Sequence, residues 1–219
     1  AYMDRNLGAR TATPGEAGIA GLLYQWGRKD PFLASGDIAS ATPNTVASSV
    51  LSEDMQWMVI PSSQVVGTVA FATKNPTTFI TGVSPNYSWL HTPDISLWGN
   101  VKTIYDPCPA GWKVAQSELG VNLRVIFYVG DPVFTFGCGK TLYDRSNEYY
   151  AYYPASGHLH FQSGDLEYVS RVGFIWSSTV ASNGSPYGFM FDENTEVDFD
   201  YKFYSSQGAS VRCQKIEQR

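Results

Sequence analysis

The chain has 219 residues, a formal net charge of −5, and a composition of 43% hydrophobic, 15% aromatic and 16% charged residues with 20 glycines and 12 prolines. No dense Lys/Arg cluster is present to neutralise a run of phosphates, which argues against nucleic acid as a partner, and no apolar run approaches the length of a membrane span. Aromatic rings pack well on pleated sheets, whereas glycine and proline break helices, so short strands and long loops are predicted.

The first half of the chain is predicted to combine a few short strands with a long irregular region. Residues 23–26 are predicted to form a strand that ends before a turn at Asp30-Pro31. Residues 33–101 read as a loop-rich insertion. Within that insertion, 65–73 and 77–83 are predicted strands.

The second half is predicted to be richer in strands. Residues 124–136 have the composition of a strand pair, and 173–179 that of a buried strand. The clearest local prediction is a hairpin over residues 187–204. Along its second arm apolar and charged residues alternate, which predicts one buried face formed by Val197, Phe199, Tyr201 and Phe203.

Eight short motifs follow one another in an order that resembles a known family. They are MDRNLGA (3–9), YQWGRKDPF (24–32), NPTTF (75–79), LWG (97–99), KTIYDPCPAGWKV (102–114), YYPASG (152–157), FIWSST (174–179) and SVRC (210–213). Taken together they resemble the Fibrobacter succinogenes major paralogous domain, a module of Bacteroidetes surface proteins that is often C-terminal in fimbrillin-like lipoproteins. The resemblance covers essentially all 219 residues.

This resemblance implies an α+β domain of C-type lectin-like architecture, with short mixed or antiparallel strands, little helix and long loops. One departure begins at Trp112: this chain has Trp112-Lys113-Val114-Ala115-Gln116 where relatives have Trp-Arg-Val-Pro-Thr, and the missing proline weakens the expected helix start. We therefore expect one domain over 1–219, the C-terminal part of a longer protein that is extracellular and attached to the cell surface, either anchored in the outer membrane or fimbrial.

The same resemblance assigns different roles to the three cysteines. Cys108 and Cys213 lie in the family's motifs, which implies a disulfide between them, and Cys138 is left over. Three reduced, packed cysteines are the alternative. An enzyme related to formylglycine-generating oxidases needs a reactive thiolate, and only Cys138 is spare for that role. A non-catalytic module is therefore expected, with such an enzyme as an alternative.

Calcium is the cofactor that a lectin-like fold suggests. Asp192, Asn194 and Asp198 are weak candidate ligands, because hard oxygen donors suit calcium. The alternation along this hairpin favours a solvated face instead, so no cofactor is expected and calcium is not favoured. His158 and His160 share a strand face without a recognisable third ligand, and are predicted to be surface or rim residues.

Aromatic residues on loops are the preferred candidates for glycan binding, because a sugar stacks on an exposed ring. Tyr87, Trp89, His91 and Trp98 lie in the irregular insertion, and Tyr149 and Tyr150 form a second candidate group. The alternative is that these rings anchor a long loop to the sheet. The expected function is adhesion to host or microbial glycans or surface proteins at the tip of a fimbrial or surface lipoprotein. A purely structural subunit that contacts other pilins is the alternative.

Overall fold

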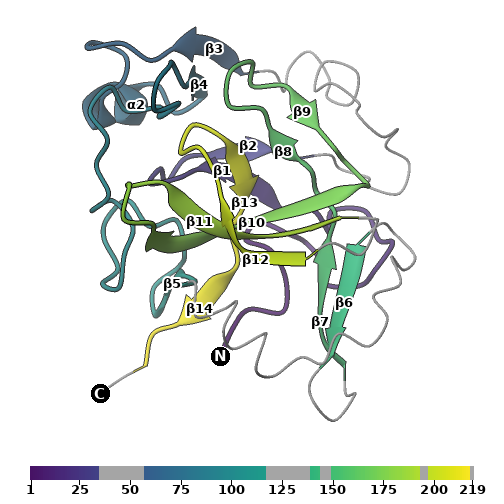
Figure 1. The fold of residues 1–219 in the computed structure, drawn as a ribbon. Helices are drawn as coiled ribbons and strands as arrows, with labels where there is room; N and C mark the ends of the chain where they lie inside the picture. Colours follow the sequence, from purple (N-terminus) through teal and green to yellow (C-terminus); the bar gives the residue numbers. More distant parts are fainter. Residues whose placement is uncertain (35–56, 117–138, 144–148, 193–196, 218–219) are drawn as a thin grey trace.

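The computed structural model describes residues 1–34, 57–116, 139–143, 149–192 and 197–217, and these form fourteen strands and one α-helix. Eight strands belong to the largest sheet: β1 (Leu22–Gln25), β2 (Pro31–Leu33), β8 (His158–Leu159), β9 (Leu166–Glu167), β10 (Val172–Val180), β11 (Pro186–Asp192), β12 (Val197–Lys202) and β13 (Gly208–Ser210). Their order is β12-β11-β10-β13-β1-β2, and β8 pairs with both β13 and β9 (Figure 1). Strands from the two ends of the chain thus meet at the centre of the sheet.

Three two-stranded sheets surround this large sheet. They are β3 (Met58–Pro61) with β4 (Thr78–Thr81), β5 (Trp112–Val114) with β14 (Cys213–Lys215), and β6 (Gly139–Tyr143) with β7 (Tyr149–Pro154). The β3–β4 pair is parallel and lies with the helix α2 (Val69–Lys74) at one corner of the molecule, away from the β6–β7 hairpin (Figure 1). Among the described residues no helix is long and apolar enough to cross a membrane.

The expected α+β class is wrong, because the described part of the chain is mostly β. Its single helix has six residues, against fourteen strands. This balance agrees with the composition, in which aromatic residues favour strands and glycine and proline interrupt helices. The strand order alone does not show a C-type lectin-like fold.

The helix α2 also corrects a local prediction, since residues 65–73 were expected to form a strand. The Thr68 side chain accepts a hydrogen bond from the Phe71 amide and caps the helix, and Asn75 ends it. Val69 and Ala72 pack against the main core from one side of the helix. A side-chain cap and a tertiary contact therefore override the β propensity of the valines.

The hairpin expected near the C-terminus is present. β11 and β12 pair in antiparallel register, with Tyr187 opposite Lys202 and Phe191 opposite Val197. Phe199 and Phe203 are buried as the alternation predicts, but Tyr201 is 37% exposed. Its exposure marks the place where the buried face of the hairpin opens to solvent.

Four tryptophans form the centre of the main core: Trp26, Trp89, Trp98 and Trp176 are each at most 3% exposed. Each indole N–H donates to a backbone carbonyl, as from Trp89 to Trp26 and from Trp176 to Tyr24. A buried indole needs such a partner, because an unpaired donor in the core costs free energy. The tryptophans therefore fix the loops to the sheet through hydrogen bonds as well as packing.

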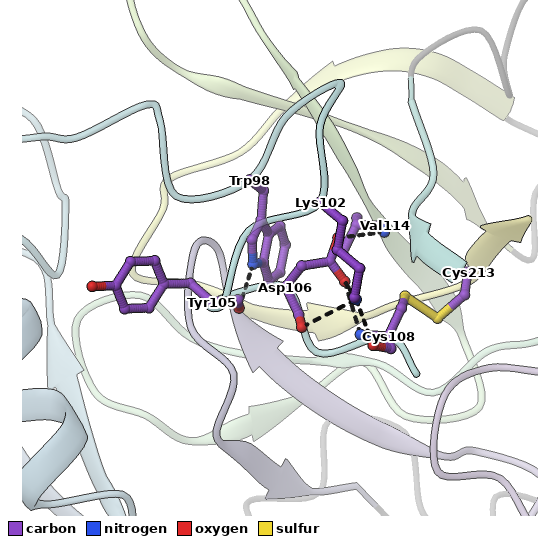
Figure 2. Close-up of a disulfide and its surroundings, with 7 residues drawn as sticks. All are labelled: Trp98, Lys102, Tyr105, Asp106, Cys108, Val114 and Cys213. Atoms are coloured by element: carbon purple, nitrogen blue, oxygen red, sulfur yellow. Dashed lines mark hydrogen bonds and ion pairs between the residues drawn. A yellow bond between two sulfur atoms is a disulfide. The ribbon is translucent and has the colours of Figure 1, made fainter. Parts of the chain in front are cut away.

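A disulfide joins Cys108 to Cys213, as the resemblance implied, so the fully reduced alternative is wrong for this pair. Cys213 opens β14 and lies opposite Val114 of β5, so the bridge reinforces a strand pair (Figure 2). The N-terminus joins the same pair, because Met3 donates to the Cys213 carbonyl and Tyr2 bridges to Gln214. The bridge, β5, β14 and the chain start thus form one unit.

Asp106 organises the corner beside this bridge. Its carboxylate is buried and accepts hydrogen bonds from the Cys108 and Val114 amides and from the Lys102 ammonium (Figure 2). The side chain therefore satisfies one backbone donor of the Pro-Cys-Pro turn, at Cys108, and one of β5, at Val114.

The Asp106→Asn substitution tests this role. We expect it to lower the free energy of unfolding by about 2 kcal/mol. The asparagine N–H₂ group would face one of the two backbone N–H groups, and the substitution also removes the negative charge that pairs with Lys102. Urea unfolding measures the change. The control Asp4→Asn breaks an exposed pair with Arg5 and is expected to cost under about 0.5 kcal/mol. Equal effects of the two substitutions would contradict the proposed role.

Candidate ligand-binding cleft

A cleft of about 350 Å³ lies between the β8–β9 hairpin and the β10–β11–β12 part of the large sheet. The segment after β12 closes one side of it through Tyr204 and Gln207. In Figure 1 the β8–β9 hairpin stands beside β10, to which it is tied through β13. The volume falls in the range of small-molecule sites, so this cleft is the candidate functional site.

Five of the thirteen residues that line the cleft carry phenyl or phenol rings: Phe161, Tyr168, Phe174, Tyr201 and Tyr204. The three tyrosines remain exposed to solvent by 37% to 41%. They are held in place by ring contacts, with Tyr204 against Phe161 and Tyr201 against Phe174. The cleft thus presents rings that are supported from behind and open to solvent in front.

An unusual turn directs Tyr168 into the cleft. Tyr168 has a φ of 57° and Ser170 a φ of 68°, a left-handed conformation that costs a residue with a side chain about 1 kcal/mol or more. The Tyr168 carbonyl accepts from the amides of Arg171 and Val172, which closes the turn. Such strain is retained mainly at functional sites, and here it places an exposed ring at the rim.

The start of β8 has a matching backbone requirement. Gly157 has a φ of 68°, and a Cβ built on it would lie 2.2 Å from the Glu167 carbonyl oxygen. Only glycine permits this close approach of β8 to β9. The approach sets His158 opposite Glu167 across the two strands, and both side chains line the cleft.

His158 forms the floor of the cleft and is only 6% exposed, so it is a buried residue and not the surface or rim residue that the sequence predicts. Its ring stacks on Tyr168 at 5.5 Å and meets the Phe174 ring edge-on at 4.6 Å. Burial, and secondarily the neighbouring His160, lowers the pKa of His158 from 6.5 to about 3. The imidazole is therefore neutral at physiological pH.

Polar side chains also line the cleft. Glu167 and Asp192 bring carboxylates, Lys202 an ammonium and Gln207 an amide, while His160 lies beside Phe161 with ring centres 4.4 Å apart. With His158 neutral, the two carboxylates outnumber the single ammonium. Hydroxyl groups are well matched to such a set, because they donate to carboxylates and accept from amides and ammonium groups.

Of the residues predicted to bind ligand, Tyr87 lies nearest to the cleft. Its ring packs edge-on against Phe161 at 5.0 Å and Tyr204 at 4.9 Å, both of which line the cleft. Its φ of 45° is also left-handed. His91 is exposed but does not line the cleft. Tyr87 therefore supports the cleft from behind.

Trp89 and Trp98 do not offer a surface to a sugar, because each is 1% exposed within the main core. Their indole N–H groups donate to the carbonyls of Trp26 and Tyr105, so both rings anchor a loop to the sheet, as the alternative interpretation holds. Tyr149 and Tyr150 begin β7, and their side chains lie outside the described part of the structure.

The weak metal candidates do not form a cluster within the described residues. Asp192 lines the cleft, Asp198 accepts a hydrogen bond from the Asp200 amide, and Asn194 lies outside the described residues. Across the described ranges no group of three or more His, Cys, Asp or Glu side chains is arranged to hold a metal ion. Cys138 also lies outside those ranges.

The sequence missed most of the cleft's aromatic residues. The alternation of His158 and His160 did indicate that both face one side, and both line the cleft. Tyr201 belonged to the alternating arm of the hairpin, but its ring packs against Phe174 of β10, which comes earlier in the chain. Comparisons of the chain with protein-family models, with curated proteins and with solved structures found no match.

Proposed function

We propose that this protein is a non-catalytic binding module of the cell surface that recognises glycans through the cleft. The observation that carries the proposal is the set of three exposed tyrosines, Tyr168, Tyr201 and Tyr204, in a cleft that is also lined by charged and amide side chains. The apolar face of a sugar ring packs on an aromatic ring, while its hydroxyls need hydrogen-bonding partners. Both requirements are met by neighbouring side chains in this cleft.

The surroundings of the tyrosines favour a preformed site. Tyr168 rests on His158, and Tyr204 rests on Phe161 and Tyr87. Rings that are already fixed lose little conformational entropy when a ligand binds, so weak individual contacts add up to useful affinity. The strained turn at Tyr168 is consistent with this role.

The proposed location rests on two further observations. A disulfide between Cys108 and Cys213 is typical of proteins in oxidising compartments, such as the cell exterior. The ordered motifs resemble a module of Bacteroidetes surface proteins, which suggests a fimbrial or surface lipoprotein as the parent protein. In that setting the partners are host or microbial glycans, and the binding is expected not to need calcium.

The Tyr168→Ala and Tyr201→Ala substitutions test the proposal. Each is expected to weaken binding by about tenfold or more on a glycan array and in titrations with the glycans that the array identifies, since each removes a stacking surface. Ile104→Ala, at a residue 77% exposed and outside the cleft, is the control and should bind like the wild type. Binding should persist in EDTA. An empty array, or pull-downs that return only pilins, would overturn the proposal in favour of a structural subunit.

A further inference from the structure

His158 and Glu167, at the floor of the cleft, have hydrogen-bonding groups that are available to a ligand. His158 has no hydrogen-bond partner for Nδ1, which is fully buried. The Glu167 Oε2 lies 3.8 Å from His158 Nε2, which is beyond hydrogen-bond distance. A fully buried nitrogen without a hydrogen bond, as at Nδ1, is rare in a protein interior. Nε2 faces Glu167 without a direct hydrogen bond and is the ring nitrogen that a ligand can contact.

The spacing of this pair fits one oxygen atom. A hydroxyl group placed between the two residues accepts a hydrogen bond from His158 Nε2–H and donates its own proton to the Glu167 carboxylate. The neutral imidazole has one N–H, and the facing carboxylate favours that proton on Nε2. The strand register fixes the pair, because His158 and Glu167 lie directly opposite on β8 and β9.

We propose that His158 and Glu167 form a hydroxyl clamp that selects one hydroxyl of an uncharged sugar seated against Tyr168. The inference rests on the proposed glycan function and specifies which ligand chemistry the cleft accepts. Acidic sugars are disfavoured, because Glu167 and Asp192 both line the cleft and repel a carboxylate. The exposed Lys202 is the only lining ammonium among the described residues, and water screens it.

The clamp is tested with small sugars in NMR titrations. The methyl glycosides of glucose, galactose and mannose are titrated into the wild-type protein, and the best binder is then compared with its four monodeoxy derivatives. We expect one deoxy position to weaken binding by about tenfold or more, because the buried polar groups are then left unpaired. The methyl glycoside of the uronic acid derived from the best-binding sugar is expected to bind at least tenfold more weakly than that sugar's own methyl glycoside.

Variants of Glu167 connect that position to the clamp. In Glu167→Ala the critical deoxy sugar and its parent should bind about equally, whereas in Glu167→Gln, whose amide oxygen still accepts, part of the difference should return. Glu167 is 33% exposed, so both variants are expected to fold, and Glu217→Gln is the control that should keep the full difference. If Glu167→Ala still binds the parent sugar more tightly than the critical deoxy sugar, by as much as the wild type does, the clamp is overturned and the glycan function is left intact. If no glycoside perturbs the cleft resonances, the glycan function fails and the clamp with it.

Discussion

Replacing Cys108 and Cys213 together with alanine is expected to lower the free energy of unfolding by about 5 kcal/mol. The bridge spans a sequence separation of 105 residues, and in the chain-entropy model a loop of about 100 residues contributes about 4.7 kcal/mol through the unfolded state. Both side chains are buried, so alanine also leaves a small cavity. Urea unfolding of the oxidised wild type and of the double variant measures the difference.

Two comparisons separate the bridge from the loss of side-chain volume. The wild type in excess dithiothreitol should approach the double variant, because it loses the same constraint without losing the sulfur atoms. The Cys138→Ser variant should be destabilised by dithiothreitol as much as the wild type is, since Cys138 is not part of this bridge. A wild type that unfolds at the same urea concentration with and without reductant would show that the bridge does not stabilise the fold.

The position of the bridge also predicts which part of the fold loses stability first when the bridge is removed. Met3 donates to the Cys213 carbonyl and Lys215 donates to the Ala1 carbonyl, so the chain start depends on β14. Freeing β14 from Cys108 leaves the β5–β14 pair with three residue pairs to hold it. Amide exchange near both termini should therefore rise more than exchange in β10 and β11.

Local patterns along the chain were enough to predict several strands. The hairpin of β11 and β12 was readable because its alternation depends only on neighbouring residues. The predicted strands near residues 23–26, 77–83 and 173–179 correspond to β1, β4 and β10. The sheet order was not readable, because it joins Leu23 to Ser210 across most of the chain.

The cleft was less predictable than the strands for the same physical reason. Whether an aromatic residue is a binding surface or a core residue depends on what covers it, and Trp89 and Trp98 are covered by elements far away in sequence. Tyr168 is exposed because a left-handed turn directs it, and neither Tyr168 nor Ser170 is the glycine that usually marks such a turn. Exposure is thus a property of the assembled sheet.

Mild acid is expected to destabilise the protein through His158. Burial lowers its folded-state pKa to about 3 from the ordinary value of 6.5, so between these pH values the unfolded chain binds a proton that the folded protein does not. Stability from this residue is complete above pH 6.5 and is lost as the pH falls toward 3. At about 1.4 kcal/mol per pH unit, the loss between pH 7 and pH 4 reaches about 3 kcal/mol.

The surrounding groups limit this loss only in part. The nearest carboxylate, Glu167, stands 3.8 Å from His158 Nε2 and favours the protonated ring, but it is one-third exposed and so is partly screened by water. The His160 ring, 6.5 Å away, opposes protonation. Asp192 and Lys202 line the same cleft with opposite charges. Burial therefore decides the direction of the effect.

The His158→Phe substitution isolates this contribution, because phenylalanine keeps a ring on the cleft floor between Tyr168 and Phe174 but does not titrate. At pH 7 its free energy of unfolding should lie within about 1 kcal/mol of the wild type, since the imidazole it replaces has an unpartnered buried nitrogen. Between pH 7 and pH 4 the variant should lose up to about 3 kcal/mol less than the wild type in urea unfolding. The control His91→Phe replaces an exposed imidazole, and between pH 7 and pH 4 its free energy of unfolding should fall by as much as that of the wild type. Parallel losses in the wild type and His158→Phe would mean that the floor of the cleft admits a charged imidazole.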